Sequence, residues 1–232
     1  MPDAETILQT ESAQGDTAVL IRKRPKPGER RVQILQALAS MLEQPGVERI
    51  TTAALAARLD VSEAALYRHF ASKAQMFEGL IEFIEQTVFS LVNQIAEREG
   101  SVVPDVARDA AAASSFDQGA GGRHAGKVAA MLIQFAEKNP GMTRVMVGDA
   151  LVFENERLQQ RMNQFFDKIE SIFRQNLRGA GQDSGSATPS ADAQVSASVL
   201  TAFVVGRLQR FARSGFKRLP SEHLEASLAK ML

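Results

Sequence analysis

The sequence contains no cysteine, which excludes disulfide bonds, thiolate metal sites and cysteine nucleophiles and agrees with a reducing compartment. It also has no long apolar run: residues 199–205 are too few to cross a bilayer, and the N-terminus lacks the apolar segment of a secretion signal. The 27 basic and 27 acidic residues cancel, so bulk attraction to a polyanion is excluded. We therefore expect a cytoplasmic protein without membrane contact, whose binding to a charged partner depends on local charge patterning.

No group of residues suited to catalysis is visible. The glycine-rich run at residues 119–122 follows no predicted strand, so it does not match a phosphate-binding loop. Glu82 and Glu85 lie one helical turn apart, as carboxylates often do on solvated helix faces. We expect no enzymatic activity, no cofactor and no metal. The histidines fall in separate predicted elements without metal-ligand spacing: His69, His124 and His223.

The apolar residues recur with helical spacing and show no strand-like alternation, so we predict an all-α fold. Two stretches rich in Gly, Ala and Ser, about 100–123 and 179–193, lack this periodicity and are predicted to be flexible. The longer helices are expected at about residues 30–43, 72–99, 124–138, 143–153, 154–178 and 195–216.

Residues 50–77 have the pattern of a helix-turn-helix, with two short helices followed directly by a third. Thr51 and Ser62 are suitable N-caps for the two short helices, and Ser72 with Gln75 forms a capping box for the next one. Asp60 lies in the turn and tolerates a left-handed backbone. If Leu66 and Phe70 enter the core, the outer face of the second helix presents four side chains: Glu63, Ala64, Tyr67 and Arg68.

Charge changes sign along the N-terminal region. Residues 1–16 contain four acidic residues and no basic one, whereas six basic residues crowd positions 22–31. Such a basic run is often a solvated tail. Because it directly precedes a helix-turn-helix, a basic arm that contacts the DNA backbone or minor groove is the second interpretation. Residues 1–29 are accordingly predicted to be a flexible tail with a basic arm.

The spacing V-S-x-x-x-L-Y-x-H-F-x-x-K, at residues 61–73, resembles the DNA-binding domain of the TetR family of bacterial regulators. The resemblance implies a DNA-binding domain at residues 30–76, a helical dimerisation and partner-binding domain at 77–232, and phosphate contacts from Tyr67, His69 and Lys73. His69 could instead be structural. Position alone suggests that Thr51 and Thr52 cap a helix or bind phosphate, and that residues 62–64 enter the major groove. Arg68 suits either a guanine or a phosphate. The candidate DNA-binding residues are Thr51, Thr52, Ser62, Glu63, Ala64, Tyr67, Arg68, His69 and Lys73.

The last two long helices predicted, about residues 154–178 and 195–216, have wide apolar faces. The ordinary interpretation is an intramolecular core. In the TetR family, however, the last two long helices pair with those of a second subunit, so the resemblance implies a homodimer. The residues predicted for that interface are Phe165, Ile169, Phe203, Leu208 and Phe211.

Two further runs, L-I-E-F-I-E at residues 80–85 and E-K-N-P-G-M-T-R at 137–144, resemble a subgroup of the family that acts in nucleoid occlusion. This resemblance implies a nucleoid-associated protein that binds palindromic DNA sites together with the acidic, apolar C-terminal tail of the division protein FtsZ. Phe83 and Lys138 are the candidate partner-binding residues. Phe89 lies off the main apolar stripe and could extend that surface or pack on another helix. A repressor with an apolar pocket for a small molecule is the alternative function.

Overall fold

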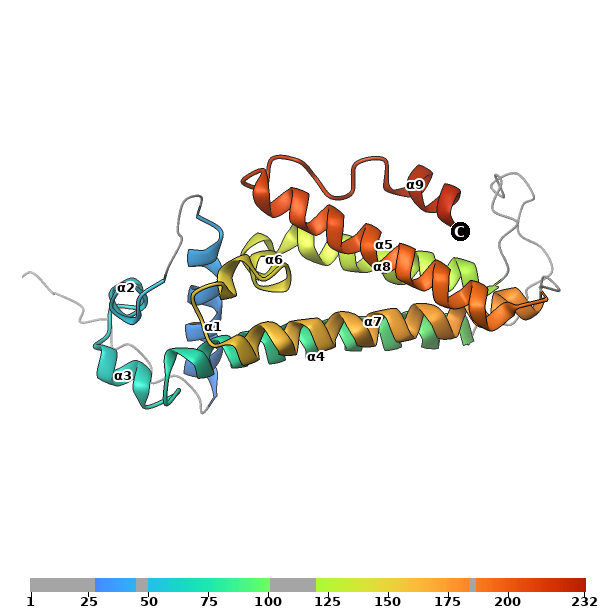
Figure 1. The fold of residues 1–232 in the computed structure, drawn as a ribbon. Helices are drawn as coiled ribbons and strands as arrows, with labels where there is room; N and C mark the ends of the chain where they lie inside the picture. Colours follow the sequence, from blue (N-terminus) through green and yellow to red (C-terminus); the bar gives the residue numbers. More distant parts are fainter. Residues whose placement is uncertain (1–27, 45–49, 101–119, 184–186) are drawn as a thin grey trace, which may run out of the picture.

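The protein has a small helical head attached to an elongated helical body (Figure 1). A computed structural model describes residues 28–44, 50–100, 120–183 and 187–232, in which all regular structure is helical. The prediction of an all-α fold is thereby confirmed. The head contains α1 (Glu29–Leu42), α2 (Thr52–Arg58), α3 (Glu63–Tyr67) and the start of α4 (Lys73–Gly100). The body continues with α5 (Ala120–Lys138), α6 (Pro140–Met146), η1 (Asp149–Leu151), α7 (Glu156–Asp183), α8 (Pro189–Arg213) and α9 (Leu224–Met231).

The helix ends in the head follow from capping chemistry. Thr51 accepts a hydrogen bond from the Ala54 amide (3.1 Å) and Ser62 accepts one from the Ala65 amide (3.3 Å), as predicted. Asp60 has a φ of 53°, the left-handed conformation expected in the turn. At the start of α4, the Gln75 side chain accepts a hydrogen bond from the Ala71 amide. In an ordinary capping box it would accept from the amide of the N-cap residue, Ser72.

One hydrophobic core runs through head and body. Phe70 and Phe77 are fully buried near the junction, and the buried stripe of α4 continues through Ile84 to Val92. In the body, α7 packs along α8 and α5, and α5 packs on α4 (Figure 1). Because α4 contributes to the core at both ends, the head cannot tilt relative to the body without disturbing this packing.

Several predicted helix boundaries are wrong. Residues 143–153 do not form one helix: α6 begins earlier, at Pro140, and a left-handed Gly148 (φ 84°) separates it from η1. Proline suits the first helical turn, where its missing N–H would have no partner. Residues 179–193 are mostly helical, since α7 reaches Asp183 and α8 begins at Pro189. The helix α5 likewise begins at Ala120, before the predicted residue 124.

The rest of the predicted flexible segments, residues 101–119 and 184–186, and the tail and arm at 1–27 lie outside the described residues. The helix α9 was not anticipated from the sequence. It buries Leu224 and Leu228 against the core, and Arg207 of α8 secures it by donating a hydrogen bond to the Ser227 hydroxyl (2.9 Å).

The structure corrects four of the five residues predicted for a dimer interface. Their side chains are buried within the protomer, because α7 packs against α8 and α5 and uses its wide apolar face there. The ordinary interpretation, an intramolecular core, therefore holds for this set. Phe203 is only partly buried and lies beneath the Arg207 guanidinium, 4.8 Å from the ring centroid. The four buried residues are Phe165, Ile169, Leu208 and Phe211.

Replacement of Gly141 by alanine is expected to destabilise the contact between α1 and α6. A Cβ at residue 141 would lie 1.9 Å from the Ala39 carbonyl oxygen, so the backbone of one helix must move. We expect Gly141→Ala to lower the free energy of unfolding by about 3 kcal/mol, measured by urea denaturation. Gly179→Ala is the control: nothing lies near its Cβ in α7, so that substitution should raise stability by about 0.5–1 kcal/mol. Equal stability of the two variants would contradict the close α1–α6 approach.

Candidate nucleic-acid interface

The helix α3 lies at one end of the molecule (Figure 1), and the exposed side chains on it and beside it are mostly polar. Leu66 and Phe70 are buried beneath it and fix which face points outward. The structure thus brings together, on one exposed surface, the candidates at the start of α3 and those that follow it. The exposed residues are Ser62, Glu63, Ala64, Tyr67, Arg68 and His69.

Thr52 and Glu63 form a direct hydrogen bond between α2 and α3. The Thr52 hydroxyl donates to the Glu63 carboxylate (2.6 Å), while the neighbouring Thr51 side chain caps α2. A carboxylate has several acceptor positions, so Glu63 keeps capacity for a further donor. The bond restrains the direction in which Glu63 presents its remaining oxygen lone pairs. Sequence reasoning identified both residues but not their contact.

Arg31 of α1 supports the end of α3. Its guanidinium donates to the backbone carbonyl of His69 (3.0 Å) and lies 4.1 Å from the centre of the Phe70 ring. Arg31 was counted from sequence within the basic arm, yet in the structure it makes intramolecular contacts. The His69 side chain itself is exposed, so only its backbone serves the structural role that the sequence left open.

Lys73, at the first turn of α4, forms an ion pair with Glu154 in the loop before α7. The Lys73 side chain is 22% exposed and that of Glu154 is 10% exposed. The ammonium also lies 5.7 Å from the centre of the Phe77 ring, and Lys73 shares a small hollow with Thr51 and Thr52. It is therefore next to the predicted phosphate-binding residues but turned toward the body. Sequence reasoning missed Glu154, because it is 81 residues away in the chain.

Two further ion pairs join α4 to α7 beyond Lys73. Arg157 pairs with Glu78, and Arg161 pairs with Glu85 at 2.6 Å. The hydrogen bond that Arg161 donates to the Glu85 carboxylate raises the pKa of Arg161 above its usual value and outweighs the opposing effect of burial. Together with Lys73–Glu154, these pairs form a series along the α4–α7 contact. The start of α7 is thus connected electrostatically to the helix that leaves the head.

The two partner-binding candidates lie on neighbouring helices. Phe83 of α4 is 40% exposed, and Lys138 is exposed at the end of α5. The helix α5 packs on α4 and runs back toward the head (Figure 1), so its C-terminal end lies near the first half of α4. Phe89 instead packs against Phe165 of α7, with ring centroids 5.6 Å apart, which confirms the second interpretation of that residue.

The helix α8 has a second apolar row, which is largely exposed when the described residues alone are considered. Val195 is 65% exposed and Val199 is 52% exposed, and Ala202 and Gly206 continue the row at helical spacing. This row is offset by two residues from the buried row that begins at Ala193, which corresponds to about 200° around a helix. The exposed row is therefore opposite the face that α8 buries in the core.

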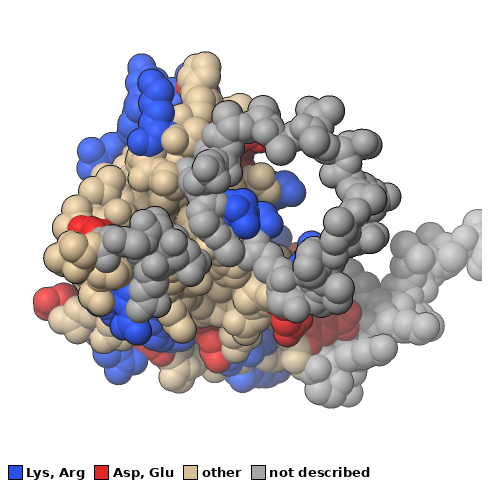
Figure 2. Space-filling view, turned by 90° about the vertical axis from the view of Figure 1, so that its right-hand side faces the viewer, with Lys and Arg blue, Asp and Glu red and all other residues tan. Residues whose placement is uncertain are grey.

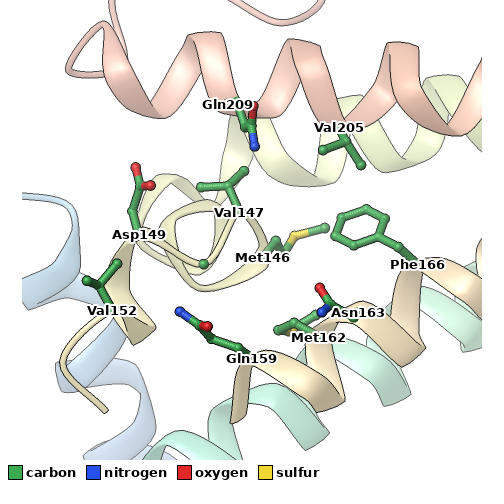
Figure 3. A pocket seen from close by; sticks show the side chains of 11 residues that line it. Met146, Val147, Asp149, Val152, Gln159, Met162, Asn163, Phe166, Val205 and Gln209 are labelled. Atoms are coloured by element: carbon green, nitrogen blue, oxygen red, sulfur yellow. The ribbon is translucent and has the colours of Figure 1, made fainter. Parts of the chain in front are cut away.

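A hollow of about 320 Å³ lies between α6, α7 and α8 and opens to solvent. Figure 3 shows the amides of Gln159, Asn163 and Gln209 around it, together with the apolar side chains of Phe166 and Val205. Since Val205 and Gln209 flank the exposed row of α8, the hollow adjoins that row. A second protein surface that covers the exposed row of α8 would also cover the hollow.

The described part of the chain holds no cluster of three or more His, Cys, Asp or Glu residues able to bind a metal. Among the helices described, none is both long and apolar enough to span a bilayer. At the end of the molecule away from the head, acidic and basic side chains are interspersed (Figure 2).

Two family descriptions match the chain. Residues 34–80 match bacterial regulatory proteins of the tetR family, and residues 124–231 match the SlmA-like form of the tetracyclin repressor-like C-terminal domain. The nucleoid occlusion factor SlmA of Aliivibrio fischeri strain MJ11 is 48% identical over 200 residues, which cover 86% of this chain and 92% of that protein. SlmA of Vibrio vulnificus strain YJ016 is 46% identical over 201 residues, with the same coverage.

Solved structures share the fold at much lower identity. The fatty acid degradation regulator FadR of Bacillus halodurans superposes with a TM-score of 0.65 at 14% identity, covering 89% of this chain and 96% of that one. FadR of Bacillus subtilis in complex with stearoyl-CoA gives 0.63 at 13% identity, with coverages of 86% and 96%. At these identities the likeness shows the fold alone.

Proposed function

We propose that this chain, which belongs to the SlmA family of nucleoid occlusion factors within the TetR family, binds chromosomal DNA as a homodimer and captures FtsZ while bound. By holding FtsZ there, it would inhibit assembly of the division ring over the nucleoid in the cytoplasm. The observation that carries the proposal is the exposed outer face of α3, which is supported from beneath by Leu66 and Phe70. An exposed short helix anchored in this way suits entry into a major groove.

The DNA contacts are assigned by position on the head. Ser62, Glu63 and Ala64 begin α3, the part of a recognition helix that reaches base edges. Glu63 would accept from a cytosine amine, and Ala64 would contact a thymine methyl group. The hydroxyls and cations around them would bind phosphates, which position the head without reading sequence. These phosphate candidates are Thr51, Thr52, Tyr67, Arg68, His69 and Lys73.

The exposed row of α8 is the proposed dimer interface in place of the buried residues predicted from sequence. Val195, Val199, Ala202 and Gly206 are small, so two such helices can approach closely. A symmetric pairing buries the same row on both subunits and covers the adjoining hollow. Phe203, partly buried at the edge of the row, remains a candidate contact. Dimerisation would set the spacing of the two heads to about 34–36 Å, one turn of DNA.

The exposed edge of α4 and the end of α5 form the proposed FtsZ surface. Phe83 supplies an aromatic side chain and Lys138 a positive charge, which complement the apolar and acidic residues of the FtsZ tail. The amides of Gln159, Asn163 and Gln209 make the lining of the hollow on the body partly polar, whereas an apolar effector favours an apolar pocket. This difference favours a protein partner over a small-molecule effector.

Substitutions in the head should separate base reading from phosphate binding. Glu63→Ala is expected to change sequence preference by about 1–3 kcal/mol at the affected base pair, because a specific acceptor is removed. Tyr67→Phe should weaken binding to all duplexes by a similar factor, because only a phosphate contact is lost. Titration of both variants against a panel of single-base operator variants checks this. A uniform loss for Glu63→Ala would remove that residue from base recognition.

A charge in the exposed row of α8 should dissociate the dimer. Val199→Asp would place a carboxylate against its symmetry mate in an apolar contact, so the variant should sediment as a monomer and lose specific DNA binding. Ala226→Asp, on the exposed surface of α9, is the control and should sediment like the wild type. Sedimentation velocity at the concentrations used for DNA binding measures both. A monomeric wild-type protein would contradict the proposed arrangement.

Loss of Phe83 and reversal of charge at Lys138 should abolish capture of FtsZ without affecting DNA binding. We expect the double variant Phe83→Ala, Lys138→Glu to lose binding to a fluorescent FtsZ tail peptide, measured by anisotropy with and without operator DNA. Phe153→Ala is the control, because Phe153 is the more exposed phenylalanine but lies in the loop before α7. If the wild type binds no tail peptide in either condition, the FtsZ proposal fails and a small-molecule-responsive repressor becomes the better assignment.

A further inference from the structure

The contact between Lys73 and Glu154 joins the head to the body at a residue that the proposed function places on DNA. Lys73 is the first residue of α4 and shares a small hollow with Thr51 and Thr52. Glu154 lies in the loop between η1 and α7, where its amide donates to the Leu151 carbonyl (3.0 Å). Because Glu154 is nearly buried, its carboxylate has lost much of its contact with water and depends on the Lys73 ammonium.

We propose that Glu154 competes with a DNA phosphate for Lys73, so that DNA binding replaces this intramolecular ion pair. The inference rests on the proposed DNA-binding function and names how that same site is regulated. In the unbound protein each head would present one positive charge fewer than the sequence suggests. DNA must then break the Lys73–Glu154 pair before the ammonium can neutralise a phosphate. The observed affinity for DNA is therefore reduced in proportion to the fraction of heads in which Lys73 is free.

The alternative, in which Lys73 bridges Glu154 and a phosphate at once, is electrostatically unfavourable. Both groups are anionic, and bringing them to the same ammonium places like charges a few ångströms apart beside a buried surface. A neutral Lys73–Glu154 pair also releases no counterion from DNA, whereas an unpaired lysine does. Exchange of partners avoids this repulsion, and it requires the loop that carries Glu154 to turn the carboxylate toward water.

Release of Glu154 from Lys73 would affect the loop that leads into α7. The loop around it carries two exposed apolar side chains, Val152 and Phe153, and Val152 also lines the hollow between α6, α7 and α8. Beyond the loop, α7 remains attached to α4 through Arg157–Glu78 and Arg161–Glu85. The loop is thus the part that DNA binding would loosen, and by reciprocity a partner that holds Glu154 on Lys73 would weaken DNA binding.

The test compares Glu154→Gln with a matched control, Glu78→Gln, in the full-length dimer. Both variants neutralise one carboxylate that pairs with a cation across the contact of α4 with α7 or the loop before it, and Glu154→Gln, which breaks the more buried pair, should unfold at a lower temperature than the wild type. Only Glu154→Gln frees Lys73, and we expect it to bind DNA about fivefold more tightly per head. The probe is a fluorescein-labelled duplex of arbitrary sequence, long enough for both heads, at low salt, because a phosphate contact is independent of sequence.

A double-mutant cycle with Lys73→Gln separates competition from a general loss of negative charge near DNA. Lys73→Gln should lower the salt dependence by about one unit of slope per head. In that background, Glu154→Gln should give no further gain in affinity, since the residue for which Glu154 competes is absent. Tighter binding combined with lower thermal stability, dependent on Lys73, is a result that a purely structural role would not produce.

The remaining outcomes overturn either the inference or the proposed function. If the wild type binds the duplex and Glu154→Gln binds it equally or more weakly, Glu154 does not compete and the inference fails while DNA binding stands. A gain that persists in the Lys73→Gln background, or appears equally in Glu78→Gln, also overturns it. If the wild type binds neither this duplex nor selected chromosomal fragments, the proposed function itself fails.

Discussion

The rest of the structure depends on the continuity of α4 through the single core that joins head and body. The helix has 28 residues, a length of about 42 Å, and buries apolar side chains along most of it. Near its start, Gly79 lies close to Phe70 and Leu35 of the head, whereas Val88 and Val92 belong to the body. A hinge between head and body would have to bend a regular helix that is packed at both ends. Movements of the head are therefore transmitted to α5 and α7, which pack against α4.

The cations described above mainly contact other residues of the same protomer. The chain has a formal net charge of zero, and several cations near the head already have partners inside the protomer. Arg31 supports α3, and Arg157 and Arg161 join α7 to α4. Single surface ion pairs contribute little to stability, but a series along one helix contact restrains the relative position of the helices. Among the described residues of the head, exposed cations such as Arg68, and any that exchange partners, would then contribute to DNA affinity.

The fold alone does not decide the function. The FadR structures share the architecture at 13–14% identity, and one of them is a complex with stearoyl-CoA. The functions proposed for this chain rest instead on side chains of three surfaces: the outer face of α3, the edge of α4 at Phe83, and the exposed row of α8. These surfaces lie on different elements, so the partners proposed for them would not compete for one surface.

The sequence by itself determined the features that depend on local chemistry. The caps at Thr51 and Ser62, the left-handed Asp60 and the inward side of α3 follow from residues within one or two turns of each other. The exposure of the candidates from Ser62 to His69 was predictable for the same reason. The helix α9 was missed although its residues favour helix, because it is only eight residues long. The helical state of residues 179–183 and 189–193 was also missed, because their Gly, Ser and Asp residues disfavour helix locally and the helices they extend are held by packing.

Only the tertiary structure decided which apolar face of α8 is buried and where Lys73 points. Both rows of α8 are apolar with helical spacing, and the neighbours α5 and α7 determine that the row from Ala193 to Phe211 enters the core. Lys73 has the same local sequence whether it faces solvent or Glu154. Its partner comes from 81 residues further along the chain, and no local pattern encodes a contact that forms only when α7 packs on α4.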